Sequence, residues 1–220
     1  MEYSKLVEIY EALSGTSKLL EKRAIIADFL KGLESREVES TVLLLEGRLF
    51  PEWDRRKIGI GTQTVIKAIS TSSGKSEDLI KADWAKIGDL GLVAERNFSS
   101  KNQATLFSGK LTIDQVFTNL RKLSEIEGSG STVKKISLIA ELLNSINGVG
   151  GKYIVRTCLE DLRTGAGFGV LRDSIASAFN VEVGNVQTAY DLTTDISRVS
   201  KVAKIEGDEG LMKLELSVGN

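Results

Sequence analysis

Residues 111–123 read LTIDQVFTNLRKL, and the apolar side chains in this stretch recur every three to four positions. Such spacing gathers them on one face of a helix and leaves the charged residues on the other. Thr112 precedes the run and is a favoured N-cap residue. Comparable apolar stripes occupy most of the remaining chain, at residues 6–13, 19–30, 133–146, 153–162 and 170–179. The sequence therefore predicts an all-α protein.

Composition supports that prediction. One proline among 220 residues favours long uninterrupted helices over a turn-rich β fold. Ser131 or Thr132 is expected to cap the helix that follows it. Gly148-Val149-Gly150-Gly151 is expected to be a loop. Alternation with period two occurs only near the end, at Met212, Leu214 and Leu216, where it allows a short strand or an irregular segment.

The two halves of the chain resemble each other. Residues 7–13 match 116–123, residues 27–30 match 140–143, and Gly59-Ile60-Gly61 matches Gly167-Phe168-Gly169. A duplicated unit would give two pseudo-symmetric lobes with about a dozen helices, at about residues 1–96 and 111–210, joined by a linker loop at 97–110. Two related lobes suit a two-fold-symmetric ligand such as duplex DNA. The alternative is that amphipathic helices resemble one another whatever their origin.

Composition also excludes several classes of function. The chain has 29 Lys and Arg, 30 Asp and Glu, no His, and a single cysteine, Cys158. Without histidine it cannot form a Ser-His-Asp site or a His-ligated zinc centre, and one cysteine cannot form an internal disulfide. No apolar run approaches the roughly 20 residues that span a membrane, and the N-terminus does not resemble a signal peptide. We therefore expect a soluble, cytoplasmic protein without a membrane partner.

The catalytic motifs suggested by short patterns are incomplete. Gly74-Lys75-Ser76 ends like a phosphate loop, but Ile69 stands where the first glycine should be. Gly59 and Gly61 lack the third glycine of a dinucleotide fingerprint, because Thr64 occupies that position. The carboxylates are scattered along polar helix faces. We expect no catalytic residue, metal ion or cofactor in this chain.

Three glycine-led helix starts remain as candidate binding sites. Glycines ahead of a helix let a foreign backbone approach, and the helix N-terminus favours a phosphate. Basic and hydroxyl side chains beside them add donors. The predicted DNA-binding residues are Gly59, Gly61, Thr132, Lys134, Lys135, Arg163, Thr164, Gly165 and Gly167. The alternative is that these glycines only cap helices and allow tight packing, but three such starts with polar neighbours favour contacts to a nucleic-acid backbone.

Charge is unevenly distributed along the chain, whose net charge is −1. Residues 101–172 hold ten basic and six acidic side chains, whereas residues 173–220 hold four basic and eight acidic ones. The third quarter is therefore the electropositive part, and it contains the clearest glycine turns. Because no cluster of aromatic residues is present to read bases, binding should be directed at the backbone and indifferent to sequence.

A second candidate contact lies in the predicted linker loop. Gln103, Leu106 and Phe107 form a Gln-x-x-aliphatic-aromatic pattern in an otherwise polar segment. Exposed Leu and Phe side chains beside a glutamine suit an apolar pocket on another protein. The alternative is that Leu106 and Phe107 fold the loop back onto the core.

Eight short segments in a fixed order resemble one protein family. They are 27–30 (ADFL), 50–53 (FPEW), 58–61 (IGIG), 88–91 (GDLG), 111–112 (LT), 134–136 (KKI), 162–165 (LRTG) and 206–211 (EGDEGL). Together they resemble the N-terminal DNA-binding domain of archaeal and eukaryotic-type ATP-dependent DNA ligases, over essentially all 220 residues. The archaeal form is the more similar.

The resemblance implies a fold and a role. Family members have an all-helical first domain of two pseudo-symmetric lobes, which binds the minor groove over a nick. The resemblance places the predicted DNA-binding residues at the phosphate backbone, and it matches Gln103, Leu106 and Phe107 to a short peptide that binds the sliding clamp (PCNA). We therefore expect a non-catalytic domain that grips nicked double-stranded DNA in DNA replication, repair and recombination. The alternative is a helical scaffold whose main partner is the sliding clamp.

The resemblance also implies what this chain lacks. In the family, the lysine of a Lys-x-Asp-Gly motif takes AMP from ATP, with Mg, in a catalytic adenylation domain that is accompanied by an OB domain. The nearest match here is Lys81-Ala82-Asp83-Trp84, in which tryptophan replaces the glycine. We expect the chain to be a fragment of an enzyme, an ATP-dependent DNA ligase, whose remaining domains are its partners.

Overall fold

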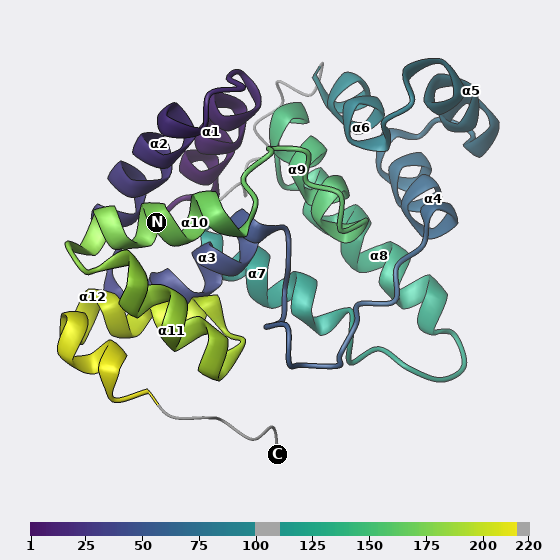
Figure 1. Ribbon diagram of the computed structural model, residues 1–220. Coiled ribbons are helices and arrows are strands. Elements are labelled where there is room, and N and C mark those ends of the chain that lie inside the picture. Colours follow the sequence, from purple (N-terminus) through teal and green to yellow (C-terminus); the bar gives the residue numbers. More distant parts are fainter. Residues whose placement is uncertain (100–110, 215–220) are drawn as a thin grey trace. The chain divides into compact units, whose positions relative to one another are not determined.

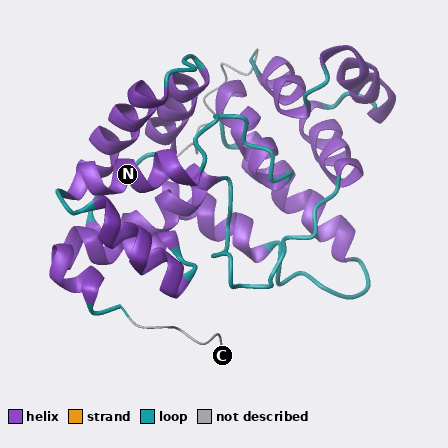
Figure 2. Ribbon diagram, in the orientation of Figure 1, coloured by secondary structure: helices purple, strands orange, loops and turns teal. Residues whose placement is uncertain are grey.

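The computed structural model describes residues 1–99 and 111–214. These residues form twelve α-helices and a short 3-10 helix at Ser35–Glu37, so the all-α prediction is confirmed (Figure 1). Figure 2 shows only helices and connecting loops, and the one extended contact in the described residues is an isolated bridge between Glu2 and Thr112. Met212 ends α12, so no strand begins there. The helices are α1 (Tyr3–Ser14), α2 (Leu19–Lys31), α3 (Val38–Glu46), α4 (Thr62–Ser73), α5 (Glu77–Ile87), α6 (Leu90–Phe98), α7 (Ile113–Lys122), α8 (Ser131–Asn144), α9 (Gly148–Cys158), α10 (Phe168–Phe179), α11 (Val183–Thr193) and α12 (Ile196–Met212).

Helix α7 forms where the apolar stripe predicts it. The Thr112 hydroxyl accepts a hydrogen bond from the backbone N–H of Gln115, and the Gln115 side chain accepts one from the Thr112 backbone, so the predicted N-cap is confirmed. The stripe itself is buried, at Ile113, Val116, Phe117 and Leu120. Because each such side chain contributes about 1.5–3 kcal/mol on burial, packing rather than propensity stabilises this helix.

Two expectations about helix starts are wrong. Neither Ser131 nor Thr132 caps α8, because Gly130 occupies the N-cap position at φ 77, a conformation that residues with side chains avoid. Residues 148–151, which read like a loop in the sequence, form the first turn of α9. A methyl group on Gly148 would lie 2.5 Å from the backbone oxygen of Glu95, so glycine is what lets α9 lie this close to α6.

The helices divide into two compact units, each formed from both halves of the sequence. The first unit comprises Met1, residues 8–56 and residues 163–220, of which 163–214 are described. In this unit α2 packs on α10, and α3 and α11 both pack on α12. Figure 1 shows the purple α2 beside the green α10. An ion pair of 2.7 Å between Arg23 and Asp173 joins these two helices.

The second unit comprises residues 2–7 and 57–162. Here α4 packs on α8, α6 packs on α9, and α5 contacts both α4 and α6. The Ser72 hydroxyl on α4 donates a hydrogen bond of 3.1 Å to the backbone oxygen of Ala140 on α8. The second unit is thus held by pairs of helices that lie far apart in the sequence.

The two units are interleaved along the chain, whereas the predicted lobes at 1–96 and 111–210 each follow one half of the sequence. Phe98 ends α6 inside the predicted linker at 97–110, and most of that linker lies outside the described residues. Each unit nevertheless contains a similar pair of packed helices. In the first unit α2 packs on α10, and in the second unit α8 packs on α4. The internal duplication stays a prediction.

Candidate nucleic-acid interface

The second unit contains a glycine turn that leads into α4, here called the α4 turn (residues 58–63). Gly59 has φ +61, the left-handed conformation that glycine adopts without strain. Gly61 is extended, with φ −102 and ψ 168, and is the N-cap of α4 without a capping side chain. Lys135 reaches over from α8, and its ammonium donates a hydrogen bond of 2.7 Å to the backbone oxygen of Ile58. A lysine from the neighbouring helix therefore holds the α4 turn.

The first unit contains a turn of the same construction ahead of α10, here called the α10 turn (residues 164–169). Gly165 has φ +65. Gly167 is extended, with φ −73 and ψ 171, and is the N-cap of α10, again without a capping side chain. Lys22 on α2 donates a hydrogen bond of 2.5 Å to the backbone oxygen of Thr164. The two turns therefore share three features. Each has a left-handed glycine, then an extended glycine as N-cap, and in each a lysine from another helix bonds to the carbonyl before the first glycine.

The match between the two turns has a different register from the sequence alignment. The sequence alignment pairs Gly59-Ile60-Gly61 with Gly167-Phe168-Gly169. The backbone conformation pairs Gly59-Ile60-Gly61 with Gly165-Ala166-Gly167 instead. In both segments the first glycine is left-handed and the last glycine is the N-cap of a helix. Gly169 lies within α10. Residue type alone could not separate these two registers.

Both turns present backbone donors that lack acceptors among the described residues. Within residues 1–99 and 111–214, the N–H groups of Gly59, Gly61, Gly165 and Gly167 have no hydrogen-bond acceptor, and all four glycines are exposed. A Cβ on Gly61 or Gly167 would meet nothing within 4 Å. Free N–H groups ahead of a helix, together with the positive end of the helix dipole, form a site for an anion such as a phosphate.

The remaining predicted DNA-binding residues lie on α8, which packs on α4, and at the start of the α10 turn. Arg163 is exposed directly before the α10 turn and has φ +58, which is uncommon for a residue with a side chain. Thr132 and Lys134 are exposed in the first turn of α8, the helix that supplies Lys135. Thr164 is only 4% exposed, so its hydroxyl does not reach the surface. The predicted DNA-binding residues are therefore divided between the two units.

Lys22 belongs to the candidate site, although the sequence did not single it out. It is 6% exposed, and it bonds to a carbonyl 142 positions further along the chain. One signal could have found it. The alignment of residues 27–30 with 140–143, carried five positions back, places Lys22 opposite Lys135.

The predicted clamp-binding residues Gln103, Leu106 and Phe107 lie outside the described residues. Their role stays a prediction.

Aromatic packing fixes the start of α10. The ring of Phe168 lies 4.2 Å from that of Tyr190 on α11, measured between centroids. The Tyr190 hydroxyl donates a hydrogen bond of 2.5 Å to Glu52. Burial, and then this hydrogen bond, raise the pKa of Tyr190 above its ordinary value, so the hydroxyl keeps its proton and the bond persists in alkaline solution. The α10 turn is therefore anchored from two sides, by α11 and by Lys22.

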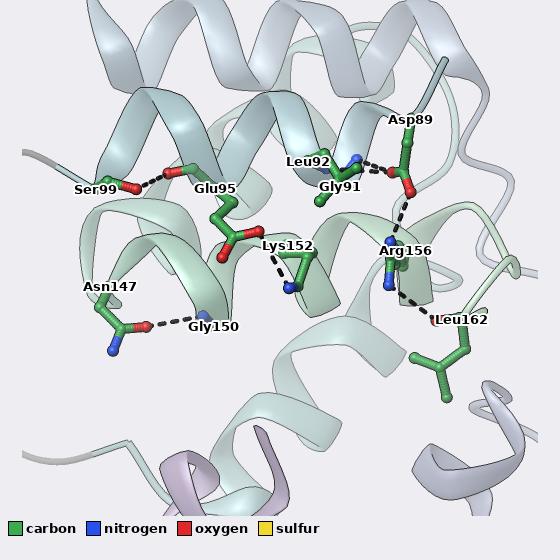
Figure 3. A network of polar contacts seen from close by, with 10 residues as sticks. All are labelled: Asp89, Gly91, Leu92, Glu95, Ser99, Asn147, Gly150, Lys152, Arg156 and Leu162. Atoms are coloured by element: carbon green, nitrogen blue, oxygen red, sulfur yellow. Dashed lines mark hydrogen bonds and ion pairs between the residues drawn. The ribbon is translucent and has the colours of Figure 1, made fainter. Parts of the chain in front are cut away.

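A buried polar network in the second unit leads up to the segment before Arg163. Asp89 is the N-cap of α6 and accepts hydrogen bonds from two backbone N–H groups in its first turn (Figure 3). It also pairs at 2.7 Å with Arg156 on α9, which donates a bond of 3.5 Å to the backbone oxygen of Leu162. Lys152 and Glu95 form a second pair between the same two helices. The network ties the chain just ahead of Arg163 to α6 and α9.

The two turns present backbone N–H groups as hydrogen-bond donors. Within residues 1–99 and 111–214, no three His, Cys, Asp or Glu side chains are grouped to hold a metal ion. Burial raises the pKa of the Cys158 thiol to about 12, so it is protonated near neutral pH. None of the helices in this part of the chain has the length and hydropathy needed to span a bilayer. Exposed amides beside cationic side chains are suited to anion binding.

The chain is similar to known proteins over its whole length. A family model described as DNA ligase N terminus matches residues 2–176. The DNA ligase of Methanobrevibacter smithii is 43% identical over 219 residues, which cover 100% of this chain and 40% of that protein. The DNA ligases of Methanothermobacter thermautotrophicus and Thermococcus fumicolans are 39% and 40% identical, over 99% and 100% of this chain. The chain spans about 40% of the length of these relatives.

Proposed function

This chain belongs to the DNA ligase N-terminal family, and we propose that it binds nicked duplex DNA through the phosphates, at the α4 turn and the α10 turn. The relatives that it matches are DNA ligases of more than twice its length. We infer that a longer ATP-dependent ligase uses this region to hold the broken strand while its remaining domains, with ATP and Mg, seal the nick in replication, repair and recombination. The sliding clamp is a further proposed partner.

One observation carries the proposal: in each unit, exposed glycine N–H groups with no acceptor in the described part of the chain precede a helix without a capping side chain. Such groups suit the oxygen atoms of a phosphate, and they carry no information about the bases. Binding should therefore depend on the DNA backbone and be the same for unrelated sequences.

Arg163 supports the same proposal. A residue with a side chain pays about 1–2 kcal/mol to adopt a left-handed conformation, and such strain persists mainly where function requires it. At φ +58 and exposed, Arg163 stands next to the amides of the α10 turn. Its guanidinium adds planar donors that suit a phosphate.

Alanine at Gly61 or at Gly167 tests the proposal without disturbing the fold. Neither glycine has a positive φ, and a methyl group at either position meets no protein atom within 4 Å. The methyl group would instead occupy the space that a DNA backbone needs. We expect each variant of the whole chain to bind a fluorescent nicked duplex about tenfold more weakly, as measured by anisotropy.

Gly184→Ala is the matched control, because Gly184 on α11 also has open space at its Cβ position. Its affinity for the duplex should equal that of the unaltered chain. Urea unfolding would establish that all three variants are folded. If folded Gly61→Ala and Gly167→Ala bind the duplex as tightly as the control does, the two turns are not the DNA contacts.

A further inference from the structure

We propose that Lys22 and Lys135 are matched positioning residues, each of which turns a glycine N–H outward by holding the carbonyl that precedes it. This inference rests on the proposed function, since it assigns those N–H groups to DNA phosphates. It adds Lys22 to the interface. It also gives Lys135 a different task from the direct phosphate contact that the sequence predicts.

Lys22 is buried behind the α10 turn. Its ammonium donates to the backbone oxygen of Thr164 at 2.5 Å. A Cβ on Gly165 would lie 2.6 Å from the same nitrogen. The ammonium therefore fills the place that a side chain at position 165 would take, and it does so from inside the protein, because Lys22 is 6% exposed.

Lys135 holds the corresponding place at the α4 turn. Its ammonium donates to the backbone oxygen of Ile58 at 2.7 Å. A Cβ on Gly59 would lie 3.2 Å from that nitrogen. Lys135 comes from α8, which packs on α4, as Lys22 comes from α2, which packs on α10. A hydrogen bond from a lysine to the carbonyl before a left-handed glycine thus occurs in both units.

The geometry of the peptide group determines where the glycine N–H points when a lysine holds the preceding carbonyl. In a planar trans peptide the C=O and the following N–H point to opposite sides. Because the Thr164 carbonyl faces the buried ammonium of Lys22, the N–H of Gly165 faces away from it. The same holds for Ile58 and Gly59 beside Lys135. A charged donor holds a carbonyl more firmly than a neutral one, so each lysine opposes rotation of the peptide that would turn its N–H inward.

The test follows backbone amide resonances of the ¹⁵N-labelled whole chain during titration with a short nicked duplex. Lys22→Met keeps the alkyl stem and removes the ammonium. We expect Gly165 and Gly167 to lose their DNA-induced shifts in this variant, whereas Gly59 and Gly61 keep theirs. The affinity for the duplex should fall about tenfold.

Lys135→Met should give the reciprocal result. Gly59 and Gly61 should lose their shifts, and Gly165 and Gly167 should keep them. Since Lys135 is only half-buried, this variant keeps the test decisive even if Lys22→Met folds poorly. The controls are Lys31→Met on α2 and Lys81→Met on α5, which remove equal charges from exposed ion pairs and should leave all four shifts unchanged.

A reciprocal, local loss of shifts is a result that general destabilisation would not produce, because unfolding affects both turns together. The inference is overturned if folded lysine variants keep all four shifts and full affinity, or if each variant loses the shifts of both turns. An unaltered chain that binds no duplex would overturn the proposed function, and with it this inference. An unaltered chain that binds, beside variants that bind equally well, would overturn the inference alone.

Discussion

Gly165 combines two constraints at one position. Its φ is +65, and a Cβ there would lie 2.6 Å from the Lys22 ammonium. An alanine would have to adopt a left-handed conformation and also displace the ammonium from the Thr164 carbonyl. We expect Gly165→Ala to lower the free energy of unfolding in urea by about 2–3 kcal/mol.

Gly169→Ala is the control for this prediction. Gly169 lies within α10, its φ is not positive, and a Cβ there meets nothing within 4 Å. Alanine should leave stability unchanged or raise it by up to about 1 kcal/mol, because alanine is the better helix former. Equal stability of the two variants would mean that neither the backbone conformation nor Lys22 constrains position 165.

The sequence predicts the glycines and Lys135 as candidate site residues, because backbone N–H groups at a helix start, with cationic side chains beside them, favour a phosphate. It could not show what Lys135 contacts. Its ammonium bonds to a protein carbonyl, and that contact depends on α8 lying against the chain before α4. The burial of Thr164 is hidden for the same reason, since tertiary packing alone decides which side of a turn faces water.

Helices α6 and α9 depend on the pair formed by Asp89 and Arg156. Both residues are buried, at 6% and 9% exposed, and Asp89 caps α6 as well. Asp89→Ala would leave the Arg156 charge buried without its partner. We expect the free energy of unfolding to fall by about 3–5 kcal/mol, measured in urea.

Asp78→Ala offers the comparison, because the Asp78 side chain on α5 is 97% exposed and its ion pair with Lys81 spans 3.9 Å. It should change stability by less than about 0.5 kcal/mol. Adding Arg156→Met to Asp89→Ala should recover part of the loss, since the unpaired charge is then gone. Equal destabilisation by Asp89→Ala and Asp78→Ala would refute the role assigned to the buried pair.

Helices such as α7 were predictable because an apolar stripe and a capping residue suffice to define them. The start of α9 was not. Four residues that include Gly148, Gly150 and Gly151 read as a loop, since glycine is a poor helix former. Their helical conformation is stabilised by close packing, in which a larger residue at position 148 would collide with the Glu95 backbone.

In the whole molecule, the two compact units could not be read from the sequence. Sequential elements usually pack as neighbours, so two lobes in chain order are the natural expectation. The units instead depend on contacts such as that between Lys22 and Thr164, 142 positions apart. A local pattern carries no information about such pairs, and the matched halves of the chain give only an indirect sign of them.

The salt dependence of binding to nicked duplex tests whether this chain grips DNA by its phosphates. Each phosphate neutralised on binding releases counterions, so the affinity should fall as salt rises. For two phosphates, one at each turn, we expect a loss of about tenfold between about 50 and 200 mM salt, and a steeper loss if Arg163 also contributes. Two duplexes of unrelated sequence should give the same slope. An affinity that does not change with salt, or no binding at all, would contradict the account.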